Sequence, residues 1–391
     1  MKDPVTLSTG VTYDRESIHS WIFSYNRNTC PVTKQPLTHQ TLTPNTTLLR
    51  LIQSWQLQNS SNHARLVSLS ASKRVLDLSL IGKLVAECRK NAAGSQLSSL
   101  HKMKSLIQDD DYNRRCMEEA GVASVMASLI TDQTASDHPF SDLTDDVAAV
   151  EEAIHLLYLL KPSAESLKKL AERKNGKLIA SLSSVMHQGS YRARTHATLL
   201  LDMILKAVGE IYKADLQPEL FHSLVEIVKD QNVSQATKAA LSILLEVAPF
   251  GSNGAKAIRA GMMEVVVELL VETDERRSCE SMLGLLEVFF GMGDGRAAFL
   301  GHPMGLAAVS SKILKVSQVA NERAVKVLWM VCKFCERDVV QEMVEIGGVA
   351  KLCMVVQSEC SVKAKERAKD VLGWHFKSWR KSRCFPSNMR L

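Results

Sequence analysis

The sequence predicts a mostly α-helical protein, in which a long array of helical repeats follows a small α+β module. Three observations carry this prediction. Pairs of apolar segments recur over the last two thirds of the 391 residues, and the first part of the chain instead holds short strand and turn signals. Residues 59–74 between them are polar and apolar-poor, as expected of a linker.

The repeat begins with apolar segments that have helical spacing, and these segments start 56, 42, 42, 44 and 43 residues apart. A break that often contains glycine precedes each one, and a second apolar helix follows it. The first helices are predicted to begin at Val122, Leu178, Leu220, Met262, Leu306 and Val349. The second helices are predicted to begin at Glu151, Thr195, Lys238, Ser281, Ala324 and Lys365.

Paired helices with this period resemble armadillo repeats, which stack into a right-handed superhelix with a concave groove. The resemblance covers residues 75–375 and implies an all-α superhelix there. The long first spacing comes from residues 131–146, which carry five acidic and no basic residues and which we expect to form an acidic, disordered loop. Trp329 stands alone, without the Asn and Trp ladder of the nuclear-import armadillo proteins.

The net charge of +6 is concentrated at the C-terminus, because the residues from Ser361 onward include nine Lys or Arg and only two acidic residues. We interpret residues 376–391 as a solvated basic tail and expect no nucleic-acid partner, since no aromatic stacking motif accompanies the charge. No signal peptide or long apolar run is present, so stable membrane insertion is not expected. The nine cysteines lack regular spacing, which favours reduced thiols and a cytoplasmic location, with the nucleus as an alternative.

The N-terminal module reads as two short strands, a helix, a proline-pinned loop and a last helix. The strands are predicted at Val5–Leu7 and Val11–Tyr13, around a Ser-Thr-Gly turn. Asp14 and Asn45 are predicted to cap the two helices. The apolar positions of the helices are Ile18, Trp21 and Ile22 in the first and Leu48, Leu51, Ile52 and Trp55 in the second.

The stretches MKDPVTLSTGVTYDRESIHSWI, CPVTKQPL and LTPNTTLLRLIQSW resemble a U-box, the RING-shaped domain that polar interactions hold together without zinc. Compared with the family, residues 1–58 lack an initial strand and first loop, so we expect an N-terminally truncated U-box. The polar network is predicted to draw on Ser8, Thr9, Thr12, Asp14, Arg15, Asn28, Thr33 and Lys34.

A U-box followed by armadillo repeats resembles a large plant family of ubiquitin ligases. The stretches VSQVANERAVKVLW and CSVKAKERAKDVL resemble the subgroup that acts in stress and immune signalling. The resemblance implies a scaffold that holds a ubiquitin-charged conjugating enzyme near a protein substrate, without a covalent intermediate. It implies no catalytic residue, metal or cofactor, and homo-oligomers remain open.

By position, the resemblance assigns the conjugating-enzyme cleft to Val5, Trp21, Pro31, Val32 and Pro36. Helix periodicity alone places Trp21 in the core, whereas the surrounding family match favours a contact role. The substrate groove is expected on the second helix of each repeat, near His196, Lys238 and Arg323.

An alternative function is a ligase-inactive adaptor that competes with full-length ligases, which the lack of the first U-box loop motivates. Two other motifs are interpreted structurally. Cys332 and Cys335 form a CxxC inside a helix, and their second pair, Cys353 and Cys360, is spaced too widely for a zinc ribbon. The GMGDG stretch at 291–295 is expected to be a turn between repeats, since no strand precedes it.

Overall fold

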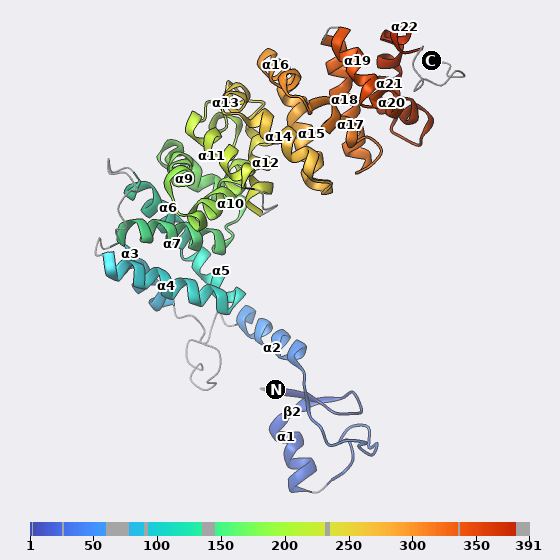
Figure 1. Ribbon diagram of the computed structural model, residues 1–391. Helices are drawn as coiled ribbons and strands as arrows, with labels where there is room; N and C mark the ends of the chain where they lie inside the picture. Colours follow the sequence, from blue (N-terminus) through green and yellow to red (C-terminus); the bar gives the residue numbers. More distant parts are fainter. Residues whose placement is uncertain are drawn as a thin grey trace. The chain divides into compact units, whose positions relative to one another are not determined.

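The computed structural model describes residues 1, 3–25, 27–59, 78–89, 93–134, 145–230, 235–334 and 337–380. The chain divides into two compact units, residues 1–74 and 75–391, which are treated separately below (Figure 1). Apart from Asn59, the predicted linker at 59–74 lies outside the described residues.

The first unit contains a small antiparallel sheet of strands β1 (Pro4–Thr6), β2 (Thr12–Asp14) and β3 (Thr43–Pro44), in the order β2-β1-β3. Val5 lies opposite Tyr13 on one side and Pro44 on the other. The turn between β1 and β2 uses Gly10, whose φ of 79° is in the region that glycine favours. The predicted β1 and β2 were each displaced by one residue, and β3, only two residues long, was not predicted.

Helix α1 (Arg15–His19) continues directly as a π-helix over Ser20–Ser24, and helix α2 (Thr46–Asn59) closes the unit. The predicted cap of α2 is confirmed, because the Asn45 Oδ1 accepts from the Leu48 amide at 2.9 Å. The Asp14 side chain does not cap α1 and instead accepts from the Asp3 amide at 3.1 Å. The buried apolar core is small and consists of Val5, Leu7, Ile18, Ile22, Cys30 and Leu37.

Polar contacts connect the strands and helices around this core. The Arg15 Nε lies 2.5 Å from the Asp3 Oδ2, and the Asn45 Nδ2 donates to the hydroxyls of Thr6 and Thr12 at 3.3 and 3.1 Å. The two threonine hydroxyls are 2.9 Å apart, across strands β1 and β2. The expectation of a polar network holds for Thr12, Asp14, Arg15, Asn28 and Thr33. Asn45 and Thr6 were missed as members.

The second unit is an array of α-helices, as predicted (Figure 1). Its first two helices are α3 (Leu78–Cys88) and α4 (Ala93–Asp109). The later repeats generally contain a short first helix, a second helix and a third helix.

The short first helices are α5 (Asp111–Glu119), α8 (Ala164–Glu172), α13 (Asn253–Arg259), α16 (Gly293–Gly301) and α19 (Arg337–Glu345). The second helices are α6 (Val122–Gln133), α9 (Lys177–Gln188), α11 (Pro218–Lys229), α14 (Met262–Glu272), α17 (Gly305–Ser311) and α20 (Gly348–Gln357). The third helices are α7 (Asp145–Leu160), α10 (Tyr191–Ala207), α12 (Gln235–Val247), α15 (Arg276–Phe290), α18 (Gln318–Phe334) and α21 (Val362–Trp374). Short 3-10 turns lie at Arg173–Gly176 and Glu210–Tyr212.

The sequence therefore predicted two of the three helices that a repeat generally contains. The helices predicted as the first of each pair are the observed second helices, and their predicted starts lie within two residues of the observed ones, because glycines mark these starts sharply. The helices predicted as the second of each pair are the observed third helices, which begin three to six residues earlier than predicted. Gly121, Gly176, Gly261 and Gly347 each adopt a positive φ, between 73° and 91°, directly before a second helix. The first helices were missed because they are short, mostly polar on one face and occupy the segments we interpreted as breaks. The GDG of GMGDG belongs to one of them, at the start of α16.

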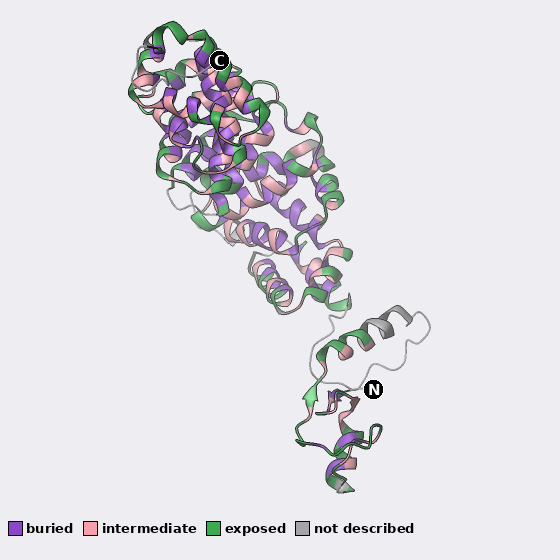
Figure 2. Cartoon of the chain, turned by 90° about the vertical axis from the view of Figure 1, so that its right-hand side faces the viewer, coloured by how far each residue is buried: buried purple, intermediate pink, exposed green. Residues whose placement is uncertain are grey.

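The third helices pack against one another in chain order, and the second helices form a parallel column beside them. Their apolar faces build one continuous core that runs from Ile81 to Trp379. Figure 2 shows buried residues where the helices of this unit face one another and exposed residues on their outer surfaces. Each repeat thus buries its apolar faces only with the help of its neighbours.

Two predicted boundaries of this unit need correction. Helix α6 extends through Gln133 into the segment expected to be an acidic loop, and Thr131 in it is buried. Helix α7 begins at Asp145, so only residues 135–144 fall outside the described part.

At the other end, the predicted tail at 376–391 begins too early. Helix α22 (Phe376–Trp379) belongs to the folded unit, since Trp379 is 1% exposed and its Nε1 donates to the Val340 carbonyl at 2.8 Å. The sequence prediction assigned Trp379 to the tail because basic residues surround it in the sequence. The remaining tail residues, 381–391, lie outside the described part.

Candidate functional site

Three of the residues predicted for the conjugating-enzyme cleft, Pro31, Val32 and Pro36, lie in a tight loop at residues 29–36. Thr29 and Pro36 pair across its base, and the Cys30 amide donates to the Gln35 carbonyl at 2.9 Å. Lys34 turns the chain with a φ of 60°. These backbone constraints leave Val32 68% exposed at the tip of the loop.

Trp21 connects this loop to the helical part of the first unit. Its Nε1 donates to the Thr29 carbonyl at 2.9 Å, while its ring is half-buried against the small core. The guanidinium of Arg27 lies 6.0 Å from the ring centroid. The indole therefore supports, with its polar edge, the loop that carries Pro31, Val32 and Pro36, and it keeps part of its own surface exposed.

One predicted cleft residue does not fit. Val5 is fully buried in the centre of β1, where its side chain faces the core, so it is not accessible to a partner and that prediction is wrong. Sequence reasoning also missed two exposed aromatic residues, Phe23 and Tyr25, which are 50% and 70% exposed. For Tyr25, seven residues after Ile18, the π-helical segment shifts the helical period after His19, so a regular period gave the opposite signal.

The core side of the loop is fixed by a tyrosine and a cysteine. The Tyr13 hydroxyl lies 3.0 Å from the Cys30 Sγ and accepts from the Val32 amide at 3.2 Å. Burial acts to raise the pKa of the Cys30 thiol, but hydrogen bonds that include those from Thr33 and Tyr13 outweigh it and lower the pKa to about 6. Because Cys30 is fully buried, its thiol contributes to packing beneath the loop and is inaccessible to a partner.

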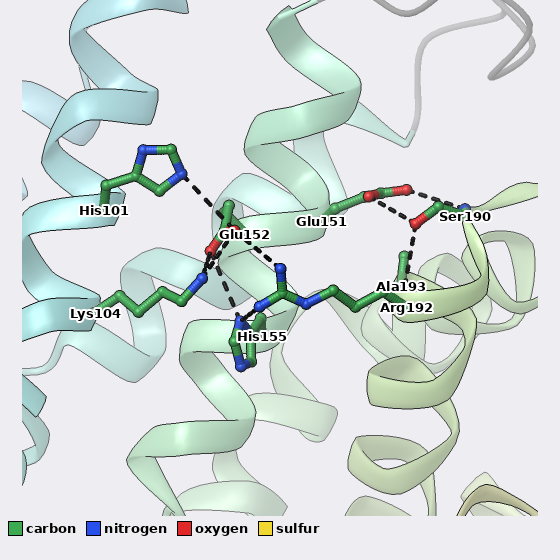
Figure 3. Close-up of polar contacts among 8 residues, drawn as sticks. All are labelled: His101, Lys104, Glu151, Glu152, His155, Ser190, Arg192 and Ala193. Carbon is green, nitrogen blue, oxygen red and sulfur yellow. Dashed lines mark hydrogen bonds and ion pairs between the residues drawn. The ribbon is translucent and has the colours of Figure 1, made fainter. Parts of the chain in front are cut away.

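On the repeats, His196 belongs to a polar cluster of α4, α7 and α10. Figure 3 shows other members of this cluster. At its centre, Glu152 of α7 accepts from the Lys104 Nζ of α4 at 3.0 Å and lies 4.0 Å from an Arg192 nitrogen of α10. Arg192 also reaches the His155 Nδ1 at 2.9 Å, and the ring of His155 stacks on that of His196 at 4.2 Å. A hollow of about 200 Å³ opens among these side chains.

The charges of this cluster set its protonation. Since a guanidinium always donates, the His155 Nδ1 accepts and His155 is neutral. Burial, followed by the charges of His196, Lys104 and Arg192, lowers the pKa of His155 to about 4. The pKa of His196 is also lowered, mainly by burial, and its Nδ1 is buried without a hydrogen-bond partner. The pKa of Glu152 is lowered despite its burial, because Lys104 donates to it.

The other two predicted groove residues lie on later third helices, away from this cluster. The Lys238 Nζ of α12 lies 3.6 Å from the Glu275 Oε1 at the start of α15. Arg323 of α18 donates to the Glu280 carbonyl, and its guanidinium lies over Gly284, where an added Cβ would meet the Arg323 Nη1 at 2.3 Å. The three predicted residues thus share one column of helices but do not form one pocket.

A recurring contact in this column escaped sequence reasoning. A serine begins several third helices, and a glutamate of the preceding third helix accepts a hydrogen bond from its hydroxyl. The hydroxyl-to-carboxylate pairs are Ser190 with Glu151 at 2.8 Å, Ser317 with Glu280 at 2.7 Å and Ser361 with Glu322 at 3.0 Å. Serine at the helix start was the available signal, but its partner lies one repeat away in sequence.

The C-terminal end of the column carries aromatic residues, which corrects the expectation that Trp329 stands alone. Its ring centroid is 5.6 Å from that of Trp374, its Nε1 donates to Asp370 at 3.1 Å, and the Lys333 Nζ lies 4.8 Å from the ring centroid. Trp374 is 47% exposed. The face therefore ends in an open aromatic pair, which is suited to contacts with a partner's apolar or cationic side chains.

Within the described residues, no group of three or more His, Cys, Asp or Glu side chains is arranged to hold a metal ion. Cys332 and Cys353 are buried in the repeat core. In the same part of the chain, every helix is too short or too polar to cross a membrane.

Comparison with known families accounts for both units. A model of the plant U-box protein ARM repeat region matches residues 79–390, and a model of the U-box domain matches residues 1–61. The chain belongs to the family of plant U-box proteins with armadillo repeats. This U-box protein is 40% identical to the E3 ubiquitin-protein ligase PUB23 of Arabidopsis thaliana over 396 residues, which cover 100% of the chain and 93% of PUB23.

A second Arabidopsis thaliana relative, the E3 ubiquitin-protein ligase PUB22, is 38% identical over 100% of the chain and 94% of its own length. Solved structures resemble the U-box protein in fold alone. One, from a study of a phosphorylation switch in the interaction between cadherin and beta-catenin, has a TM-score of 0.57 at 12% identity, over 80% of this chain and 57% of that chain. An engineered protein has a TM-score of 0.52 at 15% identity, over 75% of this chain and 67% of its own.

Proposed function

We propose that this U-box protein is a ubiquitin-protein ligase. In this proposal the U-box recruits a ubiquitin-charged conjugating enzyme, and the third-helix column of the repeats recruits a protein substrate. The observation that carries the proposal is the presence of both modules in one chain, in the same order as in relatives that are named E3 ubiquitin-protein ligases.

The proposed conjugating-enzyme surface consists of Trp21, Pro31, Val32 and Pro36. Two features support it. The loop is held rigidly by its own backbone hydrogen bonds and by Tyr13, so little conformational entropy is lost when a partner binds. Val32 is exposed at the tip of a loop whose Thr29 carbonyl accepts from the half-buried Trp21 indole, and partly buried tryptophans are enriched among the residues that dominate interfaces.

Ubiquitin transfer by this surface requires no nucleophile from the U-box protein. The scaffold binds the charged enzyme and restricts the thioester to a geometry in which a substrate lysine attacks it, so that the amide bond forms as the enzyme's cysteine leaves. The burial of Cys30, the cysteine of the described U-box, agrees with such a mechanism.

The proposed substrate surface runs along the third helices, from the cluster around Glu152 to the Trp329 and Trp374 pair. Its charged groups are largely tied to neighbouring helices, as Lys238 is to Glu275. Such a prearranged surface offers a partner fixed charges, the exposed ring of Trp374 and the half-buried ring of Trp329 without ordering many side chains. A role in plant stress or immune signalling, in the cytoplasm or nucleus, is proposed from the resemblance of residues 316–329 and 360–372 to that subgroup.

The proposal is tested by measuring conjugating-enzyme binding after a substitution that should disturb the fold least. Val32→Arg places a charge on an apolar contact at the loop tip and should weaken binding by about 2 kcal/mol, roughly 30-fold, as measured by calorimetry with a conjugating enzyme that serves many U-box proteins. Trp21→Ala should weaken binding at least as much, but it also removes the Thr29 hydrogen bond and so loosens the loop.

The matched control is Leu51→Arg. Leu51 is 63% exposed on α2, so this variant makes the same chemical change outside the loop and should leave binding within about twofold. Equal binding by wild type and Val32→Arg would remove the loop from the interface. A wild-type chain that binds substrate but engages no conjugating enzyme would instead favour the ligase-inactive adaptor.

A further inference from the structure

A second open surface of the repeat unit lies away from the third helices. A hollow of about 1010 Å³ separates α13 and α14 on one side from α16 and the turn at 302–304 on the other. We call it the α14–α16 groove. No third helix contributes to its lining, so it is distinct from the proposed substrate surface.

One wall of the groove is acidic. Glu264, Glu268 and Glu272 are four residues apart on α14, so their exposed carboxylates lie on one face of the helix, with a rise of about 6 Å between successive residues. Within the described parts of the chain, none of the three forms an ion pair. By contrast, Asp274, just beyond α14, lies 2.8 Å from the Lys312 Nζ. The wall therefore lacks a counter-charge among the described residues. Its three carboxylates also repel one another, because like charges at this spacing are destabilising.

The rest of the groove is apolar and shallow. Val271 and Met304 line it and are 43% and 46% exposed. On the opposite wall α16 presents the small residues Ala298 and Gly301. An added Cβ at Gly301 would meet nothing within 4 Å, so packing within the chain does not require glycine there, and its absence of side chain leaves room for a partner's backbone.

No lysine or arginine lines the groove, and His302 is its one group that can become cationic. The carboxylate spacing of about 6 Å matches the spacing of alternate residues in an extended peptide, and of every fourth residue in a helix. Anionic lipid and nucleic acid would both be repelled by this wall.

We propose that the α14–α16 groove binds a Lys- and Arg-rich segment of a partner protein that carries apolar residues between its charges. The basic side chains pair with Glu264, Glu268 and Glu272, and the apolar side chains cover Val271 and Met304. This second docking surface operates whether or not the chain is a ligase.

Binding of a synthetic peptide to the full chain tests this proposal. The probe is a fluorescently labelled peptide in which lysine alternates with leucine or serine, and the readout is fluorescence anisotropy at low and high salt. The groove variant combines Glu264→Gln, Glu268→Gln and Glu272→Gln. We expect it to bind the peptide at least about tenfold more weakly than wild type at low salt, with the difference shrinking as salt screens the charges.

A matched variant makes the same charge change elsewhere. It combines Glu119→Gln, Glu172→Gln and Glu359→Gln, three exposed glutamates outside the groove that form no ion pair within the described residues. Its affinity should stay within about twofold of wild type. Unchanged binding by the groove variant overturns the proposal, and so does an equal loss in both variants, which would indicate a response to net charge alone. Circular dichroism should show the groove variant at least as stable as wild type, since it relieves repulsion.

The chain's own basic segment, residues 381–391, is the competing occupant. Deleting it from the full chain leaves peptide affinity unchanged if the groove serves a partner. A several-fold gain in affinity on deletion would show that the segment occupies the groove in cis and would overturn the assignment to a partner protein.

Discussion

Different interactions stabilise the U-box and the repeat unit. Among its described residues, the U-box has a core of six buried apolar side chains, Cys30 among them, and hydrogen bonds between short polar side chains surround this core. The repeats share one apolar core over their whole length. The small module thus depends on individual polar contacts, whereas the array depends on the sum of many similar interfaces.

This difference also separates their proposed roles. The U-box presents one rigid loop, so its binding surface is compact and its key residues adjoin one another. The repeats present long helical columns, along which His196, Lys238 and Arg323 are distributed over separate helices. A single substitution should therefore affect conjugating-enzyme binding strongly and substrate binding only in part.

The largest effect is expected in the repeat core. Phe221 on α11 is fully buried, and Phe221→Ala should cost about 3–5 kcal/mol of the free energy of unfolding of the repeat unit through lost burial and a cavity. Urea unfolding followed by circular dichroism measures this cost. The U-box, monitored by the fluorescence of Trp21 in a chain whose other tryptophans are replaced, should keep its transition. A simultaneous loss of both units would contradict their independence.

A pH-dependent effect on the repeats should come next in size. Since the folded unit holds His155 neutral with a pKa of about 4, against about 6.5 unfolded, falling pH favours the unfolded chain. This contribution to stability is complete above pH 6.5 and is lost as pH falls toward 4, by on the order of 1–3 kcal/mol. Urea unfolding across this range should show a shallower pH dependence for His155→Gln.

The control for this prediction is His187→Gln, which alters an exposed histidine on α9 and should retain the wild-type pH dependence. Around His155 the other titratable groups are His196, His101 and Glu152, with Lys104 and Arg192. Because these remain in the variant, the slope should decrease without vanishing. Identical slopes for wild type and His155→Gln would refute a neutral, buried His155.

In the U-box, one polar side chain should matter as much as an apolar one. Asn45→Ala removes the cap of α2 and both hydrogen bonds to the threonines of β1 and β2, so the U-box should lose about 1–2 kcal/mol. Thermal unfolding of the U-box measures this loss. Thr47→Ala, at a neighbouring exposed position, should change stability by less than about 0.5 kcal/mol. If the two variants were equally stable, the polar network would not support the module.

The smallest effect on stability is expected from Val32→Arg. Because Val32 is 68% exposed, this change should alter the free energy of unfolding of the U-box by less than about 0.5 kcal/mol. The same change should disrupt conjugating-enzyme binding. Thermal unfolding of the variant checks the first part. A large destabilisation would mean that the loop tip supports the fold and would make any binding loss ambiguous.

The fold was largely predictable because local signals mark it. Left-handed glycines such as Gly261 fix the second-helix starts, and Asn45 was recognisable as a cap from its position alone. The first helices, such as α16, were not predictable from apolar period because their polar residues resemble loop sequence. Trp379 was misplaced for a similar reason, since its apolar character was outweighed by the basic residues beside it.

The candidate sites were less predictable, because they depend on which way a side chain faces. Val5 sits at the edge of the first loop in sequence, yet the pairing of β1 on both sides turns it into the core. His196 was identified as polar and helical, but its stacking on His155 links residues a repeat apart in sequence. Tyr25, seven residues after the buried Ile18, would lie on the buried face of a regular helix, and the π-helical segment after His19 alters that period.

The central claim, that the chain is a ligase that acts as a scaffold, is tested most directly by single-turnover discharge of a ubiquitin-charged conjugating enzyme. We predict that the full chain accelerates transfer to lysine, that Leu51→Arg does so equally, and that Val32→Arg loses the acceleration. No ubiquitin should become attached to the chain through a thioester, the bond that an added thiol cleaves by exchange. Discharge at the unassisted rate in the presence of the wild-type chain, or a thiol-sensitive ubiquitin adduct on it, would contradict the account.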